Sequence, residues 1–205
     1  MRIWDLCSGT GSVSRVWRDA GHETLTLDID PKCSPDICTD LMNWDYTCFG
    51  LEPPDFIWAS CPCTHYSIAR SKAKTPRDLE GSDAIVKRCL DIIRYWRPRY
   101  WVIENPQTGL LKTREVVRGL EFKDLDYCMY RAPYRKRTRL WTNITWTPRP
   151  LCTHQSHPMT AQKGPSRRAG QLIQGDDCSL QTLHSIPVAL TREIMEHCEN
   201  ETQED

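Results

Sequence analysis

The stretch WASCPCTHYS, residues 58–67, places two cysteines on either side of a proline at the end of an apolar segment. A C-x-C pair with no second pair nearby does not favour a zinc site, and it also differs from the redox spacing C-x-x-C. Pro62 stiffens the backbone before Cys63, and the following polar segment could close over a substrate. We interpret Cys63 as a nucleophile and Cys61 as a packing residue; a buried structural role for Cys63 stays open.

Other chemically suggestive side chains follow later apolar segments. Glu104 and Asn105 come after an apolar run, where a carboxylate is costly unless it is paired or functional. Glu104 is therefore expected to be a general acid or a hydrogen-bond anchor with a raised pKa, or else a salt-bridged structural residue. Arg137 and Arg139 alternate, so both point to one side of an extended segment, where they would suit phosphate or carbonyl oxygens in a cleft. Alone, their basic run could also be a solvated face.

A glycine loop and two acidic residues indicate a nucleoside-binding site. Gly9 and Gly11 follow the first expected strand and would let the backbone approach a ligand. Asp28 ends the second expected strand, where an acidic residue commonly holds ribose hydroxyls. Asp40 could add a contact to a base or be a turn residue. A plain turn with a capping aspartate is the alternative, but the combination favours a nucleoside cofactor.

The surrounding pattern alternates strands with helices, which predicts a mostly parallel, twisted α/β sheet with helices on both faces and ligands at the carboxyl strand ends. Residues 1–205 are expected to form one catalytic domain, with a short irregular insert at 145–180 and a frayed acidic tail at 199–205. Strands are expected at 2–6, 24–27, 55–60, 100–105, 126–130 and 139–144, and helices at 13–20, at 85–96 and from Pro187 as first helical residue.

Composition bears on the cellular compartment of the protein and on its attraction to nucleic acid or membranes. The 205 residues carry 27 basic and 27 acidic side chains, so no overall field draws the chain to nucleic acid or membrane. No apolar run reaches the length of a membrane span, and the sequence begins without a secretory leader. Eleven cysteines, an odd number at irregular spacings, predict reduced thiols. We expect a cytoplasmic protein, or a nuclear one in a eukaryotic or viral setting.

The ordered segments DLCSGTGS, LDID, CTDL, SCPCTHYS, IENP and RKRTR resemble the motifs of the DNA cytosine-5 methyltransferase family, and LHSIPVAL resembles its closing motif. The likeness covers residues 5–190. Cys7, Arg135, Pro106 and His184 depart from the residues usual in the family, and residues 145–183 are too few for its separate target-recognition domain. The resemblance implies a compact, phage- or virus-like member with a Rossmann-like class I methyltransferase fold that reads a short sequence.

The resemblance also implies a cofactor and a mechanism. S-adenosylmethionine would be converted to S-adenosylhomocysteine, and a flipped cytosine would be attacked at C6 by Cys63. Glu104 would hold N3 and the exocyclic amine, Arg139 would lie near O2, and Arg137 would support the nucleophile loop or a phosphate. Arginines near Cys63 would favour its thiolate. The cofactor site would comprise Asp5, Cys7, Gly9, Thr10, Gly11, Asp28, Ile29, Asp40, Leu41, Pro62 and Ser185.

Double-stranded DNA is the expected partner of a monomeric protein. No metal is predicted, although Cys152, His154, His157 and Cys178 could form a zinc site if their irregular loop folded around an ion. An RNA cytosine-5 methyltransferase of the tRNA type and a non-catalytic DNA-binding or regulatory relative remain alternatives; Cys63 and Glu104, both present, favour an enzyme. The expected DNA contacts are Ser67, Arg70, Arg135, Lys163, Arg167 and Arg168.

Overall fold

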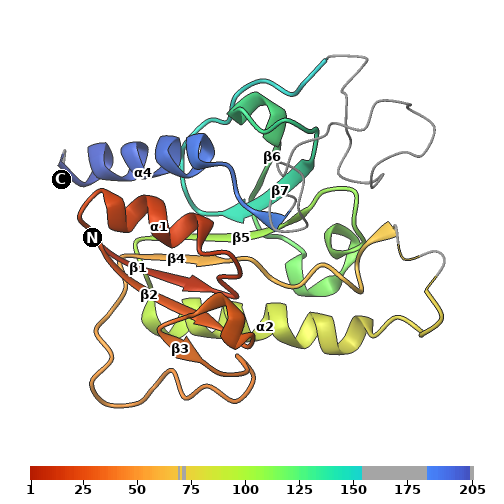
Figure 1. Cartoon of the computed structure of the whole chain (residues 1–205), viewed down its shortest axis with the longest axis horizontal. Helices are drawn as coiled ribbons and strands as arrows, with labels where there is room; N and C mark the ends of the chain where they lie inside the picture. Colours follow the sequence, from red (N-terminus) through yellow and green to blue (C-terminus); the bar gives the residue numbers. More distant parts are fainter. Residues whose placement is uncertain (69, 71–72, 154–183, 204–205) are drawn as a thin grey trace.

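The computed structural model describes residues 1–68, 70, 73–153 and 184–203, and these residues pack around a seven-stranded sheet (Figure 1). The strand order is β3-β2-β1-β4-β5-β7-β6. The first five strands of this order are parallel neighbours, whereas β7 runs antiparallel to both β5 and β6. The strands are β1 Arg2–Leu6, β2 Glu23–Asp28, β3 Ile37–Cys38, β4 Phe56–Ala59, β5 Tyr100–Pro106, β6 Phe122–Asp126 and β7 Arg137–Thr142.

Helices cover both faces of this sheet, as the sequence predicts. Helices α1 (Ser12–Asp19) and α4 (Val188–Gln203) pack side by side on one face, and α2 (Leu79–Trp96) lies on the other (Figure 1). Two hydrophobic clusters result, one joining α1 and α4 to the sheet and one joining α2 to it. Because both faces are covered, central strands such as β4 are buried along their whole length.

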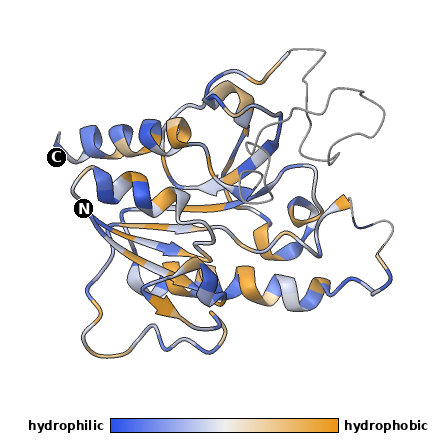
Figure 2. Cartoon of the chain, viewed as in Figure 1, coloured by the Kyte–Doolittle hydropathy of each residue, from blue (hydrophilic) through white to orange (hydrophobic). Residues whose placement is uncertain are grey.

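Local sequence explains where α2 begins and ends. The Asp78 side chain accepts a hydrogen bond from the backbone N–H of Gly81, which caps the first turn. The last turn ends at Arg97, which adopts the left-handed conformation typical of a helix terminus. Between these ends the helix alternates hydrophobic and hydrophilic residues (Figure 2), and Val86, Leu90 and Ile93 are buried against the sheet.

One predicted strand is wrong. Residues 127–130 form a 3₁₀ helix, Tyr127–Tyr130, and the strand lies just before it as β6. Tyr127 and Tyr130 are both buried, and a three-residue spacing places them on one side of a 3₁₀ turn. The edge strand β6 has an exposed first residue, Phe122, and polar residues in the middle, so it lacks the apolar run of a central strand. The following strand, β7, begins two residues before the predicted position.

The acidic tail is also more ordered than predicted. Helix α4 begins directly after Pro187, rather than with it, and continues to Gln203. The His22 ring lies 2.7 Å from the carboxylate of Glu199, and Arg99 donates a 3.0 Å hydrogen bond to the carbonyl of Glu201. These contacts anchor residues 199–203 to the body of the protein. Of the predicted insert at 145–180, residues 154–180 lie outside the described residues.

None of the helices within the described ranges combines the length and apolar character required to cross a bilayer.

Candidate active site

A cavity of about 890 Å³ lies at the carboxyl ends of β1, β4 and β5. Its volume is within the usual range of ligand pockets. Segments that are far apart in the sequence line it: the glycine loop, the segment after β2, the loop of residues 60–64, the end of β5, Lys136 and residues 184–186. Ligands of open α/β sheets bind at this edge, so the cavity is the candidate active site.

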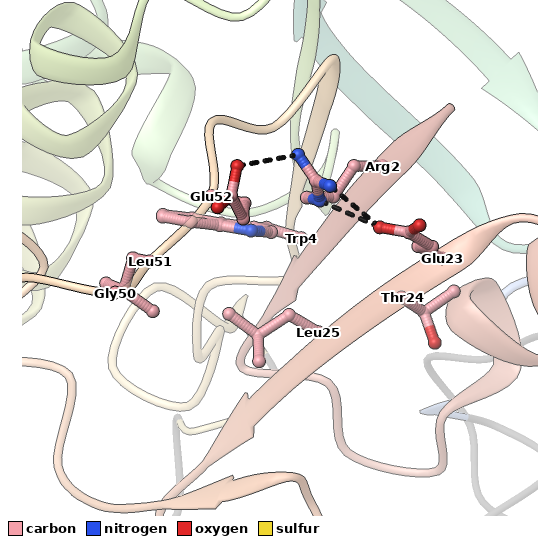
Figure 3. A pocket seen from close by; sticks show the side chains of 8 residues that line it. All are labelled: Arg2, Trp4, Glu23, Thr24, Leu25, Gly50, Leu51 and Glu52. Carbon is pink, nitrogen blue, oxygen red and sulfur yellow. Dashed lines mark hydrogen bonds and ion pairs between the residues drawn. The ribbon is translucent and has the colours of Figure 1, made fainter.

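A second cavity, of about 210 Å³, lies at the opposite end of the parallel strands (Figure 3). Its Arg2 guanidinium lies 2.9 Å from Glu23 and 3.8 Å from Glu52, so the positive charge of Arg2 is paired with carboxylates. Trp4 and Leu51 contribute apolar surface to its lining. No residue that the sequence nominates for chemistry lines this cavity.

The glycine loop is held open toward the larger cavity. Gly9 and Gly11 have φ angles of 50° and 64°, which favour glycine. A Cβ added at Gly9 would meet no heavy atom within 4 Å, so this backbone borders open space. The Gly9 N–H donates a 2.8 Å hydrogen bond to the Asp28 carboxylate, which also accepts a 2.9 Å bond from the Asp30 N–H. The structure therefore brings the glycine loop and Asp28 together.

Asp5 lies beneath this loop and supports it from the core. It is buried, and its carboxylate accepts a 3.1 Å hydrogen bond from the backbone N–H of Ser14 in the first turn of α1. Burial raises the pKa of Asp5 to about 7, although the hydrogen bond from Ser14 opposes this shift. Asp5 does not line the cavity, and it supports the loop through α1, whose Ser14 N–H donates to its carboxylate.

The closing segment returns to the glycine loop. The hydroxyl oxygens of Thr10 and Ser185 lie 3.2 Å apart, and the Ile186 N–H donates a 2.9 Å hydrogen bond to the Ser12 hydroxyl. Among the predicted cofactor residues, those that line the cavity are Cys7, Gly9, Thr10, Pro62 and Ser185, whereas Asp5, Gly11, Asp28, Ile29, Asp40 and Leu41 do not.

The predicted cofactor residues Ile29, Asp40 and Leu41, which follow β2 in the sequence, do not line the cavity. Ile29 is 66% exposed and directly precedes Asp30, which lines the cavity. The Asp40 carboxylate accepts a 2.9 Å hydrogen bond from the Met42 N–H, as in a turn. Leu41 is buried, and its carbonyl accepts a 3.4 Å hydrogen bond from Arg88 in α2.

The loop after β4 carries the two cysteines in different environments. Cys61 is buried, with its sulfur 3.6 Å from that of Cys89, so it packs in the core as the sequence predicts. Cys63 is partly exposed and lines the cavity. Its carbonyl accepts hydrogen bonds from the N–H groups of Tyr66 and Ser67, at 3.0 and 2.8 Å. This tight turn fixes the backbone of Cys63 at the cavity wall.

Glu104 lines the same cavity as Cys63 and is only 5% exposed. Its Oε1 atom accepts a 3.0 Å hydrogen bond from the Tyr127 hydroxyl and lies 3.5 Å from Lys136 Nζ. Burial raises the pKa of the Cys63 thiol, the charge of Glu104 raises it further, and Lys136 lowers it. Sequence reasoning assigned the lowering of this pKa to arginines; the basic residue that acts on the thiol is Lys136.

The two predicted arginines lie elsewhere. Arg137 binds Asp126 through two hydrogen bonds, at 3.0 and 2.7 Å, and Arg139 binds Asp124 in the same way, at 2.7 and 2.8 Å. They share one face of the sheet, as their alternation predicts, but this face is not the cavity. Arg139 pairs with Asn105 across the strands, so the alternation of side chains puts it on the face opposite Glu104.

Only some of the predicted DNA contacts and possible zinc ligands lie within the described residues. Arg135 lies 3.5 Å from Asp126, and Arg70 donates to the carbonyl groups of Thr75 and Pro76. Cys152 is buried, and the described residues contain no group of three or more side chains that could hold a metal ion. Outside the described residues lie the predicted contacts Lys163, Arg167 and Arg168 and the remaining metal candidates His154, His157 and Cys178.

Two site residues escaped the sequence interpretation. The sequence indicates only a basic run around Lys136 and predicts a strand that includes Tyr127. The available signal for Lys136 was its position one residue before Arg137, because neighbours on an extended segment point to opposite sides. No comparable signal marked Tyr127, whose contact with Glu104 joins residues 23 positions apart.

Known proteins include relatives of this chain in sequence and in fold. No protein-family model matches the chain. The chain is 30% identical over 220 residues to a probable DNA (cytosine-5)-methyltransferase of Frog virus 3 (isolate Goorha), an alignment that covers 97% of this chain and 100% of that protein. Two solved structures share the fold. One is a putative DNA modification methyltransferase encoded within an E. coli prophage (TM-score 0.54, 15% identity, 74% of this chain, 52% of that chain).

The other is the Entamoeba histolytica methyltransferase EhMeth (TM-score 0.53, 15% identity, 76% of this chain, 57% of that chain). The chain thus spans little more than half the length of either solved structure. At this identity the structures establish the α/β, Rossmann-like methyltransferase fold alone. The viral relative matches over its full length at 30% identity. The chain therefore belongs to the DNA (cytosine-5)-methyltransferase family.

Proposed function

We propose that this protein transfers a methyl group from S-adenosylmethionine to C5 of cytosine in DNA, with Cys63 as a covalent nucleophile. One observation carries the proposal: Cys63 and Glu104 line the same cavity as an open glycine loop. The full-length match to a relative described as a DNA (cytosine-5)-methyltransferase supports the choice of substrate. Each partner in the reaction has residues of suitable chemistry at this cavity.

The residues of the loop fit a nucleoside cofactor. The open space beside Gly9 would admit a group against the backbone, and the carboxylate of Asp28 lies within hydrogen-bonding distance of that backbone, near where ribose hydroxyls would bind. The exposed Ile29 side chain offers an apolar surface suited to a purine. The hydroxyls of Thr10 and Ser185 would close the site from the other side. When bound, S-adenosylmethionine supplies an electrophilic methyl group.

The side chains around the base would perform the remaining steps. A cytosine flipped from the duplex would enter the cavity, and the Cys63 thiolate would form a bond to C6. Glu104 would accept a hydrogen bond from the exocyclic amine and pass a proton to N3, which stabilises the electron density displaced into the ring; N3 returns this proton when the C6–S bond breaks. C5 then accepts the methyl group, with release of S-adenosylhomocysteine, and loses its proton to a base. The C6–S bond breaks with restoration of the C5–C6 double bond, and Cys63 leaves as a thiolate.

Trapping with modified DNA tests the chemistry directly. Duplex DNA that contains 5-fluorocytosine should remain covalently attached to the protein in the presence of S-adenosylmethionine, because fluorine at C5 blocks the loss of the proton. Mass spectrometry of the adduct should place the bond on Cys63. Cys63→Ser should abolish both the adduct and methyl transfer to ordinary duplex DNA, whereas the matched change at the exposed Cys48 should leave them intact.

An assay with S-adenosylmethionine labelled in its methyl group separates the proposal from its alternatives. Incorporation of labelled methyl groups into RNA but not into DNA would overturn the DNA assignment, and native turnover by Cys63→Ser would remove Cys63 from the mechanism. A protein that binds duplex DNA but transfers no methyl group would be a non-catalytic relative. Bisulfite sequencing of a plasmid from expressing cells would then give the sequence context of the methylated cytosines.

A further inference from the structure

Lys136 is a mostly buried cation at the reaction centre. Its side chain is 13% exposed, its Nζ atom lies 3.5 Å from Glu104 Oε1, and it lies 4.8 Å from the centroid of the Tyr127 ring. A lysine at this depth requires compensation for lost hydration, which a carboxylate and an aromatic face both provide. Lys136 lines the same cavity as Cys63 and Glu104.

The backbone explains why Lys136, and not a neighbouring arginine, occupies this position. The Lys136 carbonyl accepts a 3.0 Å hydrogen bond from the Tyr127 N–H, which fixes the residue just before β7 begins at Arg137. Arg137 and Arg139 lie on the opposite face, where Asp126 and Asp124 hold their guanidinium groups. Among the described residues, Lys136 is the basic side chain that contacts Glu104.

The charges around Cys63 come from two elements. Glu104 projects from β5 and disfavours the thiolate, whereas Lys136 precedes β7 and favours it. The other charged or titratable residues that line the cavity come from the glycine loop, α1, the segment after β2, the loop after β4 and the closing segment: Cys7, Arg15, Asp30, Lys32, Cys33, Cys61 and His184. Burial disfavours the thiolate most strongly, and the charges of Glu104 and Lys136 shift its formation in opposite directions.

We propose that Lys136 is a positioning residue of the reaction centre, whose ammonium group orients Glu104 and stabilises the Cys63 thiolate. The proposal deepens the proposed function and rests on it for the role of the two partners. The resemblance implies that arginines stabilise the Cys63 thiolate, whereas in the structure the positive charge that does so is that of Lys136. It acts through Glu104 and Cys63, so its loss should change the ionisation of Cys63 before any DNA is bound.

The rate of Cys63 alkylation as a function of pH tests this inference in the protein alone. Iodoacetamide reacts with the thiolate, and a chymotryptic peptide cut after Trp58 and Tyr66 reports modification, with fragmentation separating Cys63 from Cys61. Lys136→Met should raise the midpoint of the profile by about one pH unit, which lowers the rate at pH 7 about tenfold. Lys136→Arg should restore the midpoint because it retains the charge.

Matched variants separate charge from packing. Lys112→Met removes an exposed lysine that does not line the cavity and should leave the profile unchanged. Lys136→Gln is a second neutral variant, used if Lys136→Met does not fold, and circular dichroism verifies the fold of each. An unchanged midpoint in a folded neutral variant overturns the proposal. A midpoint for Lys136→Arg equal to that of Lys136→Met also overturns it.

The result is independent of methyl transfer. A protein that shows the expected shift but never methylates nucleic acid would retain this inference about Lys136 and Cys63 ionisation while the proposed function fails. If the protein methylates DNA through Cys63 but Lys136→Met leaves the midpoint of Cys63 alkylation unchanged, the proposed function stands and the inference about Lys136 fails. In the active enzyme, Lys136→Met should lower kcat at pH 7 about tenfold and recover toward higher pH.

Discussion

The side-chain amide of Asn105 donates a 2.9 Å hydrogen bond to the backbone carbonyl of Cys61. Asn105 is fully buried and follows Glu104 directly, so the end of β5 carries the carboxylate on one face and holds the nucleophile loop from the other. Because Pro62 is the only residue between Cys61 and Cys63, this single bond restrains the position of Cys63 relative to Glu104.

Asn105→Ala should therefore weaken both stability and turnover. The change leaves a buried carbonyl without its donor, which should lower the free energy of unfolding by about 1–3 kcal/mol. We expect kcat to fall while the affinity for S-adenosylmethionine stays near its original value, as calorimetry and methyl-transfer assays would show. Asn143→Ala is the control, because Asn143 also donates to a backbone carbonyl, that of Arg99, but outside the cavity. Equal losses of kcat in the two variants would contradict a positioning role.

Gly9→Ala should reduce the affinity for S-adenosylmethionine. The new methyl group would border the cavity, and the φ angle of 50° adds strain of about 1 kcal/mol for a residue with a Cβ. Gly119→Ala imposes similar strain, at φ 77°, without lining the cavity. Both variants should lose comparable stability in denaturant titrations, but only Gly9→Ala should weaken cofactor binding by calorimetry. Unchanged binding would show that the cofactor does not approach Gly9.

The central sheet could be predicted from the sequence because its strands are buried on both faces. β1 and β4 are largely apolar runs that lead into the glycine loop and the cysteine loop, and β5 is an apolar run that ends in Glu104, Asn105 and Pro106. This pattern is visible in the sequence alone. β6 and the 3₁₀ turn after it could not be separated in the same way. Their aromatic and polar residues fit either a strand or a turn, and the pairing with β7 that decides between them is a tertiary interaction.

In the candidate site, too, some features can be predicted from the sequence and others depend on tertiary pairing. Cys63, Glu104, Gly9 and Ser185 could be nominated because each lies at a strand end or in a recognisable motif. The sequence does not predict which side of the sheet Arg137 and Arg139 face, because this depends on the register between β5 and β7. A shift of one residue exchanges the faces, which would exchange the positions of Lys136 and the arginines.

The structure predicts that Arg139 stabilises the fold rather than the thiolate. Its guanidinium binds Asp124 and lies 3.5 Å from the centroid of the Phe122 ring. Arg139→Met should lower the free energy of unfolding by about 1–3 kcal/mol, and a double-mutant cycle with Asp124→Asn should show coupling between the two residues. The alkylation profile of Cys63 should not move. A raised midpoint in Arg139→Met would instead restore the arginine role expected from the sequence.

Asp5 should make the protein less stable as the pH rises from about 4 to 7. Burial raises the pKa of Asp5 from 3.8 to about 7, so across this interval the folded state retains a proton that the unfolded chain has released. The free energy of unfolding therefore falls with rising pH and levels off above pH 7. Asp5→Asn removes this dependence while an amide oxygen can still accept from the Ser14 N–H. At pH 8 the variant should exceed the original protein in stability by on the order of 4 kcal/mol, and near pH 4 the two should be similar.

Urea titrations of both proteins at a series of pH values would measure this difference. Subtracting the two curves isolates Asp5 from the other carboxylates, including Asp126, whose pKa is lowered by Arg137 despite the opposing effect of burial. Asp19→Asn, at an exposed position at the end of α1, is the matched control for the change of charge. If Asp5→Asn and the original protein show parallel curves from pH 4 to 8, Asp5 is ionised in the folded state. The support of the glycine loop would then include a buried negative charge next to the hydrogen bond from Ser14.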